Sequence, residues 1–163
     1  MFTSDIDDLV REMAKKRIEY NRTPKCGNKH FQHAAVIFRG NIKRGCGIMT
    51  FGMNLRKEQP YVRTIHAEAD ALYRLPLRNN KKLQSIHLCV IKTTKTGKLG
   101  NSKPCFHCIS TLIAEAPKKG YRIEWIFYSK DTGEMEKCKL SKFLETHGIF
   151  LSSYYKAKIG MPR

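Results

Sequence analysis

Two short stretches of the chain carry side chains that could bind a metal ion and move protons. The first contains His66 and Glu68, and the second contains Cys105 and Cys108. One imidazole and two thiolates suit a tetrahedral Zn²⁺ site whose fourth position stays open for water. Because Glu68 follows His66 by two residues, we expect its carboxylate beside the metal, where it can transfer protons. The sequence therefore predicts a catalytic zinc site.

Two predicted helices position these side chains. The first covers residues 66–75, with Thr64 as its N-cap and Pro76 after its end. Pro104 is expected in the first turn of the second helix, which brings the two cysteines to one face. Helix N-termini carry partial positive charge, which lowers the pKa of a nearby thiol. Both helices are therefore expected to stabilise the site through their N-termini.

Three other histidines compete as ligands. His107 lies between the two cysteines, but it projects to a different face of the predicted helix, so pocket lining or solvent exposure is expected. His30 and His33 follow a loop that contains Pro24 and Gly27, and a surface or hydrogen-bonded role is expected for both. Three ligands already complete an open site, so no metal role is assigned to these histidines.

The His-x-Glu motif followed by Pro-Cys-x-x-Cys resembles the zinc-dependent cytidine deaminase superfamily. The resemblance implies His66, Cys105 and Cys108 as zinc ligands, and Glu68 as the residue that moves protons during hydrolytic deamination. It also implies an α/β fold, a three-layer α/β/α sandwich with a central mixed five-stranded sheet. The interval between the two half-motifs is longer than in the family, and an insertion near residues 78–82 would explain it.

The resemblance also suggests residues that contact the substrate. Asn54 follows a predicted strand, where an asparagine contacts the target sugar in tRNA adenosine deaminases and polynucleotide cytidine deaminases; a turn residue is the competing interpretation. Ala67, Ser102 and Pro104 are expected to line the substrate pocket. Cations with an interleaved aromatic ring suit a groove for a single strand, although an exposed loop is the alternative. The expected nucleic-acid contacts are Arg56, Lys57, Tyr61, Arg63 and Lys103.

The net charge favours a polyanionic partner. The chain of 163 residues has a formal charge of +17. Residues 20–57 and 71–114 contain no aspartate or glutamate and are rich in lysine and arginine, and they flank or contain the halves of the proposed site. Phosphate neutralisation is the commonest use of such charge, so single-stranded DNA or RNA is the expected partner. A merely solubilising surface is the alternative.

Hydrophobic patterns predict the remaining elements. Ser4 and Asp5 are expected to cap a first helix whose apolar face is formed by Ile6, Leu9, Val10, Met13 and Ile18. The predicted strands cover residues 34–38, 47–52, 83–94, 122–128 and 135–140, and a short helix follows over residues 140–148.

The direction of the last predicted strand indicates which branch of the superfamily the chain resembles. Residues 131–133 form too short a connection for a parallel return, so the last strand should run antiparallel. This ending resembles the branch that contains free-cytidine deaminases, plant organelle RNA editors and bacterial toxin deaminases. In the tRNA adenosine and AID/APOBEC-like branch, a helix intervenes and the last strand is parallel. His66 as first ligand, in place of a cysteine, departs from the free-cytidine enzymes.

The length predicts one domain over residues 1–163, with a basic and loose tail over about residues 152–163. The sequence shows neither a signal peptide nor a transmembrane stretch, so we expect an intracellular protein, in cytoplasm or nucleus, without a membrane partner. Monomer and dimer both remain open. Four of the six cysteines are expected to be free thiols: Cys26, Cys46, Cys89 and Cys138.

The leading hypothesis is hydrolytic deamination of cytosine in single-stranded DNA or RNA. Deamination of free cytidine or deoxycytidylate is an alternative, for which the predicted C-terminal hairpin is the argument. Deamination of adenosine in a structured RNA uses the same chemistry. A hypothesis of another class is a non-catalytic module that binds nucleic acid and keeps zinc for stability, although the intact Glu68 does not favour it.

Overall fold

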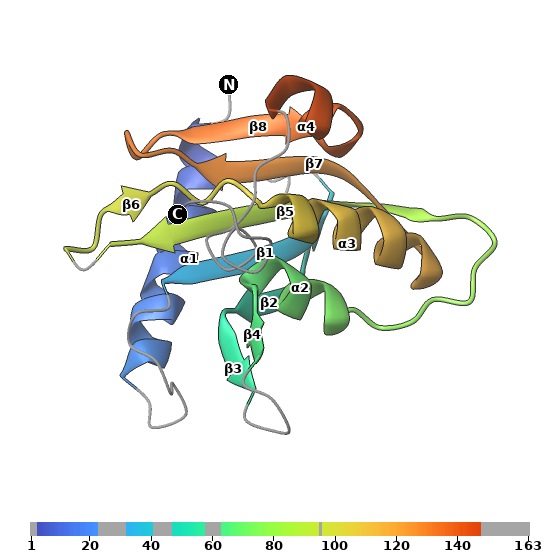
Figure 1. Cartoon of the computed structure of the whole chain (residues 1–163), viewed down its shortest axis with the longest axis horizontal. Coiled ribbons are helices and arrows are strands. Elements are labelled where there is room, and N and C mark those ends of the chain that lie inside the picture. Colours follow the sequence, from blue (N-terminus) through green and yellow to red (C-terminus); the bar gives the residue numbers. More distant parts are fainter. Residues whose placement is uncertain (1–2, 23–31, 41–46, 58–62, 95, 148–163) are drawn as a thin grey trace, which may run out of the picture.

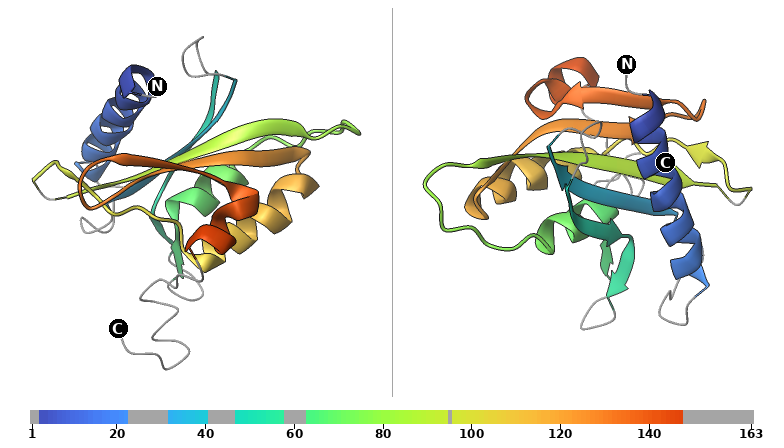
Figure 2. Two further views of the ribbon diagram at one scale, coloured as in Figure 1. Left: turned by 90° about the horizontal axis from the view of Figure 1, so that it is seen from above. Right: turned by 180° about the vertical axis from the view of Figure 1, so that it is seen from behind.

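The computed structural model describes residues 3–22, 32–40, 47–57, 63–94 and 96–147. Helix α1 (Thr3–Asn21) covers one face of a mixed sheet, whereas α2 (Ala67–Tyr73) and α3 (Phe106–Lys118) cover the other (Figures 1 and 2). The predicted three-layer α/β/α architecture is confirmed. No helix within the described ranges is both long and apolar enough to cross a membrane.

The sheet has the order β2-β1-β5-β7-β8. Its strands are β1 (His33–Arg39), β2 (Gly47–Met53), β5 (Gln84–Thr93), β7 (Tyr121–Ser129) and β8 (Met135–Lys139). Strands β5 and β7 pair in parallel because α3 forms the crossover between them, and the other neighbours pair antiparallel. The predicted mixed five-stranded sheet is therefore confirmed, and the short β6 (Leu99–Gly100) adds a further antiparallel pairing with β5.

The last strand runs antiparallel, as predicted, because a tight turn joins it to β7. Gly133 has a φ of +84°, which favours glycine, and its N–H donates to the carbonyl of Lys130 at 2.9 Å. The N–H of Lys130 donates in turn to the carbonyl of Glu134 at 2.8 Å. Helix α4 (Leu140–His147) follows β8 directly and agrees with the predicted short helix.

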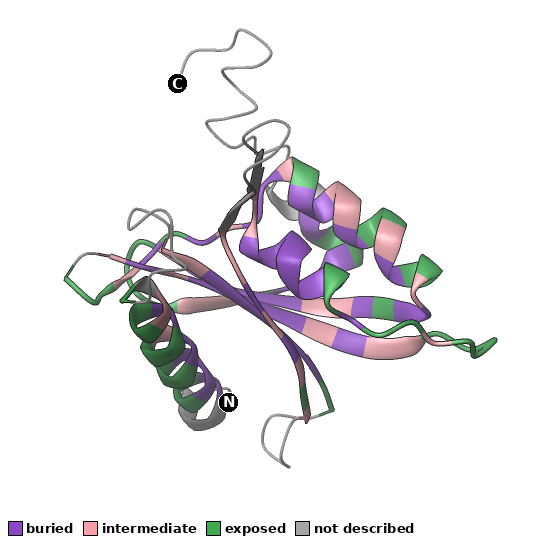
Figure 3. Cartoon of the chain, turned by 90° about the horizontal axis from the view of Figure 1, so that it is seen from below, coloured by how far each residue is buried: buried purple, intermediate pink, exposed green. Residues whose placement is uncertain are grey.

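Each face of the sheet buries its own apolar cluster. On the side of α2 and α3, aliphatic side chains of β1, β5 and β7 pack against Leu72, Ile109 and Leu112. Figure 3 shows buried segments, in purple, on these helices and on the strands beneath them. On the side of α1, a second cluster combines strand residues with the helix residues Ile6, Leu9, Val10 and Met13. The first of these clusters holds α2 and α3, the helices that carry the predicted site, against one face of the sheet.

Helix α1 differs from the prediction at two points. It begins at Thr3, so Ser4 and Asp5 lie within the helix and do not cap it. Ile18 is 38% exposed, whereas Arg17 is fully buried. The physical reason is that Arg17 follows Met13 by four residues and continues the inward stripe, whereas Ile18 is turned away from it.

A small second sheet replaces the loop that was predicted between Asn54 and His66. Strands β3 (Leu55–Lys57) and β4 (Arg63–Ile65) pair antiparallel. Thr64 lies within β4, so the prediction that it caps the following helix is wrong. Pairing with β3 keeps the chain extended through Ile65, and α2 therefore begins only after His66 and ends at Tyr73.

Candidate metal centre

His66 and Cys105 both occupy helix N-cap positions. His66 precedes α2 with φ −70° and ψ 151°, and Cys105 precedes α3 with φ −76° and ψ 164°. Neither side chain makes a capping hydrogen bond, so the imidazole and the thiol are available for other partners. Helix α3 starts at Phe106, two residues later than predicted, with Pro104 before the cap. Cys108 then lies in the first turn, and the predicted placement of the ligand set at two helix N-termini is confirmed.

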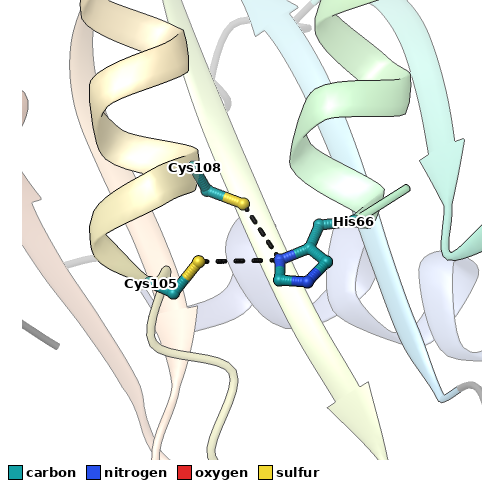
Figure 4. A group of neighbouring side chains, drawn as sticks. All are labelled: His66, Cys105 and Cys108. Atoms are coloured by element: carbon teal, nitrogen blue, oxygen red, sulfur yellow. Dashed lines mark hydrogen bonds between the residues drawn. The ribbon is translucent and has the colours of Figure 1, made fainter. Parts of the chain in front are cut away.

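The ligand atoms of these three residues converge. Nδ1 of His66 lies 3.2 Å from Sγ of Cys108 and 3.6 Å from Sγ of Cys105. Figure 4 shows the two sulfur atoms and the imidazole pointing toward one another. All three ligand atoms lie within 4.8 Å of one another. Tetrahedral zinc with ordinary Zn–S and Zn–N bonds would place nitrogen and sulfur about 3.6 Å apart. The group could therefore hold a metal ion, and its geometry fits zinc.

The two thiols have opposite electrostatic environments. A hydrogen bond from Cys108, with further help from His66, lowers the pKa of Cys105 to about 4. The same hydrogen bond, together with burial, raises the pKa of Cys108 well above its ordinary value. The hydrogen bond with Cys105 also raises the pKa of His66. The centre thus holds a thiolate at the N-terminus of α3, where the helix dipole favours negative charge.

Glu68 lies beside this centre without belonging to the ligand group. It is the second residue of α2, and only 4% of it is exposed. Burial raises the pKa of its carboxyl, while the nearby His66 opposes that rise. A carboxyl group whose pKa is raised toward neutrality can both accept and donate a proton. This position agrees with the prediction that Glu68 lies beside the metal ligands and is not one of them.

Strand β2 fixes the position of α2. A Cβ atom at Gly52 would lie 2.2 Å from the carbonyl oxygen of Ala67, so only glycine permits this approach. The Thr50 hydroxyl donates to the carbonyl of Ala71 at 2.9 Å, and the N–H of Met53 donates to Asp70 Oδ2 at 3.1 Å. Sequence analysis did not identify these contacts, since glycine and threonine in a strand give no specific signal.

Asn54 lies next to the metal centre in the strand register. Leu55 pairs with Ile65 in the antiparallel register of β3 and β4. Asn54, just before Leu55, therefore lies opposite His66, just after Ile65. Its Oδ1 atom is buried and has no hydrogen-bond partner among the residues that the structure describes. A buried polar atom without a partner is costly, and a ligand that donates a hydrogen bond would satisfy it. The substrate contact predicted for Asn54 has this physical support.

The other predicted pocket residues lie on the same helix starts. Ala67 and Pro104 are buried. The Ser102 hydroxyl donates to the carbonyl of Val90 at 2.8 Å and accepts from the N–H of Ser129 at 2.8 Å. Its side chain therefore anchors the loop before α3 to the sheet. The predicted substrate contacts of these three residues remain predictions.

The predicted nucleic-acid contacts are spread around the centre. Arg56 and Lys57 lie on β3, and Arg63 lies on β4. Lys103 is half-buried in the loop before α3, and Tyr61 lies outside the described residues. Because β3 and β4 extend from Asn54 and His66, three of these five residues lie on elements that adjoin the candidate site. Their contact with nucleic acid stays a prediction.

The remaining histidines and cysteines agree with the sequence analysis where they are described. His107 is exposed, and neither it nor the half-buried His33 belongs to the ligand group; His30 lies outside the described residues. Cys89 is buried, as expected for a central strand, and neither Cys89 nor Cys138 forms a disulfide with another described cysteine. Cys26 and Cys46 lie outside the described residues.

Fold and site together define a mixed α/β chain with an open His-Cys-Cys centre. No protein-family model matches the chain, and no curated protein matches it. Among solved structures, the crystal structure of a C-terminal deletion mutant of the Aspergillus oryzae Rib2 deaminase, in complex with DARIPP, is similar at 15% sequence identity. The match covers 91% of this chain and 83% of that chain, with a TM-score of 0.43. Similarity at this level does not assign a reaction or a substrate.

Proposed function

We propose that this protein is a zinc-dependent hydrolytic deaminase that converts cytosine to uracil in single-stranded nucleic acid. The observation that carries the proposal is the convergence of His66, Cys105 and Cys108 beside the buried carboxyl of Glu68. Structural zinc sites normally use four protein ligands and need no adjacent acid. Three ligands with a neighbouring glutamate are instead typical of a hydrolytic centre.

The residues of the chain would divide the reaction between them. His66, Cys105 and Cys108 would hold Zn²⁺, which when bound lowers the pKa of water and so supplies a nucleophile near neutral pH. A carboxyl oxygen of Glu68 would take a proton from that water and deliver it to N3 of cytosine. The hydroxide that remains would add to C4, and Glu68 would carry the proton of the resulting hydroxyl group to N4, so that the C4–N4 bond breaks, C4=O forms and ammonia leaves. One water is consumed, and uracil keeps the new oxygen at C4.

The substrate class follows from charge and from Asn54. A formal charge of +17 favours a polyanion over an uncharged nucleoside. The unpartnered Oδ1 atom of Asn54, beside His66 in the register, is suited to accept a hydrogen bond from a sugar hydroxyl or a base. The target carbon cannot be reached inside a duplex, so the expected substrate is unpaired.

The antiparallel β8 favours a second candidate, deamination of free cytidine or deoxycytidylate. Free-cytidine deaminases, which belong to the superfamily that the motifs resemble, have an antiparallel last strand. Strand β8 of this chain is likewise antiparallel to β7. A free nucleoside needs no extended basic surface, however. The two candidates therefore differ in their dependence on ionic strength, because phosphate contacts weaken steeply with salt.

The experiment that tests the proposal is deep sequencing of mixed single-stranded DNA and RNA pools after incubation with the wild-type protein. Glu68→Ala serves as the blank, and Glu115→Ala, an exposed α3 position paired with Lys118, serves as the matched control. Cytosine read as thymine or uracil with wild type and Glu115→Ala, but not with Glu68→Ala, is the expected result. Activity should also fall as salt increases.

Other outcomes assign the protein differently. Adenine read as guanine would replace cytosine by adenosine as the target base. No change in either pool, combined with turnover of free cytidine or deoxycytidylate, would favour the second candidate. No turnover of any of these substrates by a folded, zinc-loaded protein would contradict the enzyme proposal and favour a binding module.

A further inference from the structure

Helix α1 covers only part of its face of the sheet. It packs on β1 and β5, and its apolar cluster reaches Phe38 and Phe127 (Figure 2, right). Within the described part of the chain, no other helix lies on this face. The end of the sheet where β5 and β7 begin and β8 ends is therefore left without a helical cover.

One cross-strand row runs over this uncovered end. Phe38 pairs with both Ile48 and His87, His87 pairs with Trp125, and Trp125 pairs with Lys139. Residues directly opposite one another in neighbouring strands present their side chains on the same face. Phe38 is buried within this row, whereas Ile48, His87, Trp125 and Lys139 are at least partly exposed. An aliphatic, an imidazole, an indole and an ammonium group therefore reach one surface.

Two lysines lie over the indole of this row. Nζ of Lys137 lies 3.9 Å from the centroid of the Trp125 ring, and Nζ of Lys139 lies 5.3 Å from it. Both lysines are exposed, and Trp125 is partly exposed. Aromatic rings with adjacent cations on an open sheet are what a single strand of nucleic acid requires, since bases stack on the rings and phosphates contact the cations.

Two further features of this row point to a ligand. Ile48, at the end of the row on the edge strand β2, is a large aliphatic side chain that is 50% exposed. His87 stacks at a tilt on Phe38 with 5.3 Å between ring centroids, and its buried Nδ1 atom has no hydrogen-bond partner within the described part of the chain. Burial lowers the pKa of His87, which favours the neutral form of its imidazole.

We propose that the surface formed by Ile48, His87, Trp125, Lys137 and Lys139, here called the sheet-back surface, binds single-stranded nucleic acid. A base would stack against Trp125, and the two lysines would contact the flanking phosphates. The lysine side chains have flexible stems, so they can move from the ring to a phosphate. Charge complementarity favours a nucleic acid over an apolar protein segment, although Glu124, held by Ser85 at 2.7 Å, adds one acidic group nearby.

The sheet-back surface does not depend on the metal centre. Helices α2 and α3 carry the metal ligands on the opposite face of the sheet (Figures 1 and 2). Binding at the sheet-back surface would retain a strand near the protein without occupying the centre. The inference therefore holds even if the deaminase proposal fails, and it can be tested without turnover.

Trp125 is the single tryptophan of the chain, so intrinsic fluorescence reports on this surface directly. The experiment titrates the full-length protein with oligothymidylate, which is unstructured and contains no cytosine. Stacking of a base on Trp125 is expected to quench the fluorescence, and the quenching should weaken as salt increases. For the double variant Lys137→Ala with Lys139→Ala, the slope of log affinity against log salt should fall by about 1.4, the value for two phosphate contacts on a single strand.

The matched control is the double variant Lys81→Ala with Lys82→Ala, which removes the same charge from an exposed loop. It should quench like the wild type. Trp125→Ala, followed through the anisotropy of a labelled oligothymidylate, should lose about fivefold or more in affinity. Circular dichroism identifies any variant that fails to fold. If Trp125→Ala fails to fold, the double variant Lys137→Ala with Lys139→Ala still tests the proposal, because both lysines are exposed.

Three results would overturn the inference. One is oligothymidylate binding, seen by anisotropy, that leaves the fluorescence of Trp125 unchanged. Another is an equal loss of affinity in the two lysine double variants, which would indicate a general charge effect. The third is quenching that depends on protein concentration without any oligonucleotide, which would identify a second copy of the chain as the occupant.

Discussion

Nδ1 of His66 and Sγ of Cys108 lie 3.2 Å apart, although 42 positions separate these residues in the chain. The sheet brings them together. His66 enters α2 from β4, whereas Cys108 lies on the crossover helix α3 between β5 and β7. Both helices pack on the same face of the sheet, and each begins at the metal centre. The contact therefore depends on the tertiary arrangement of two helix N-termini.

Removal of one ligand should empty the metal centre. Cys108→Ala is expected to reduce bound zinc from about one ion per chain to near zero and to lower the melting temperature, because metal binding contributes to folding stability. Zinc content by mass spectrometry and thermal unfolding check both effects. Cys138→Ala removes another buried thiol, in β8, and should keep its zinc. Full zinc occupancy in Cys108→Ala would exclude this residue as a ligand.

Asn54→Ala should impair catalysis without impairing stability. Loss of one hydrogen bond to the substrate is expected to reduce kcat/KM by about tenfold to a hundredfold. The free energy of unfolding should stay the same or rise slightly, because the deleted Oδ1 atom is buried without a partner. Steady-state kinetics and chemical denaturation measure the two quantities. A large loss of stability with unchanged kcat/KM would instead assign Asn54 a structural role.

Gly52→Ala should separate β2 from α2 and disturb the metal centre. The new Cβ would meet the carbonyl oxygen of Ala67 at 2.2 Å and the N–H nitrogen of Ala71 at 2.4 Å. We expect a loss of about 3 kcal/mol in the free energy of unfolding, together with weaker zinc binding. In the control Gly100→Ala, the Cβ meets only side-chain atoms, the nearest at 3.5 Å, so the effect should be small. Equal stability of the two variants would refute the close approach.

His33 should make the protein less stable in mild acid. Burial, with Lys92 as the next cause, lowers the pKa of His33 from 6.5 to about 4. Between these values the unfolded chain holds the proton and the folded chain does not, so lowering the pH through this window favours unfolding. His33→Gln removes this contribution.

The free energy of unfolding, measured from pH 7 to pH 4 in excess zinc, checks this expectation. The stability of His33→Gln relative to wild type should rise as the pH falls. Parallel curves for wild type and His33→Gln would show that burial of His33 does not oppose its protonation.

The sequence alone determined the donor set and much of the fold. One histidine and two cysteines at helix starts predict an open metal site, because their chemistry and spacing are local properties. The short turn at residues 131–133 requires an antiparallel β8, since a parallel return needs a longer connection. Arg17 shows the limit of predicting buried residues from hydrophobic spacing, because this charged residue is buried and continues the apolar face of α1.

Only the tertiary structure decided how distant residues meet. The pairing of β3 with β4 displaced the N-cap of α2 from Thr64 to His66, and the approach of α2 to Gly52 depends on packing between separate elements. The row from Ile48 to Lys139 crosses five strands. Its members are far apart in the chain, and only the strand order and register bring them together. Local patterns fix which residues a strand or helix contains, whereas neighbours across a sheet depend on the whole fold.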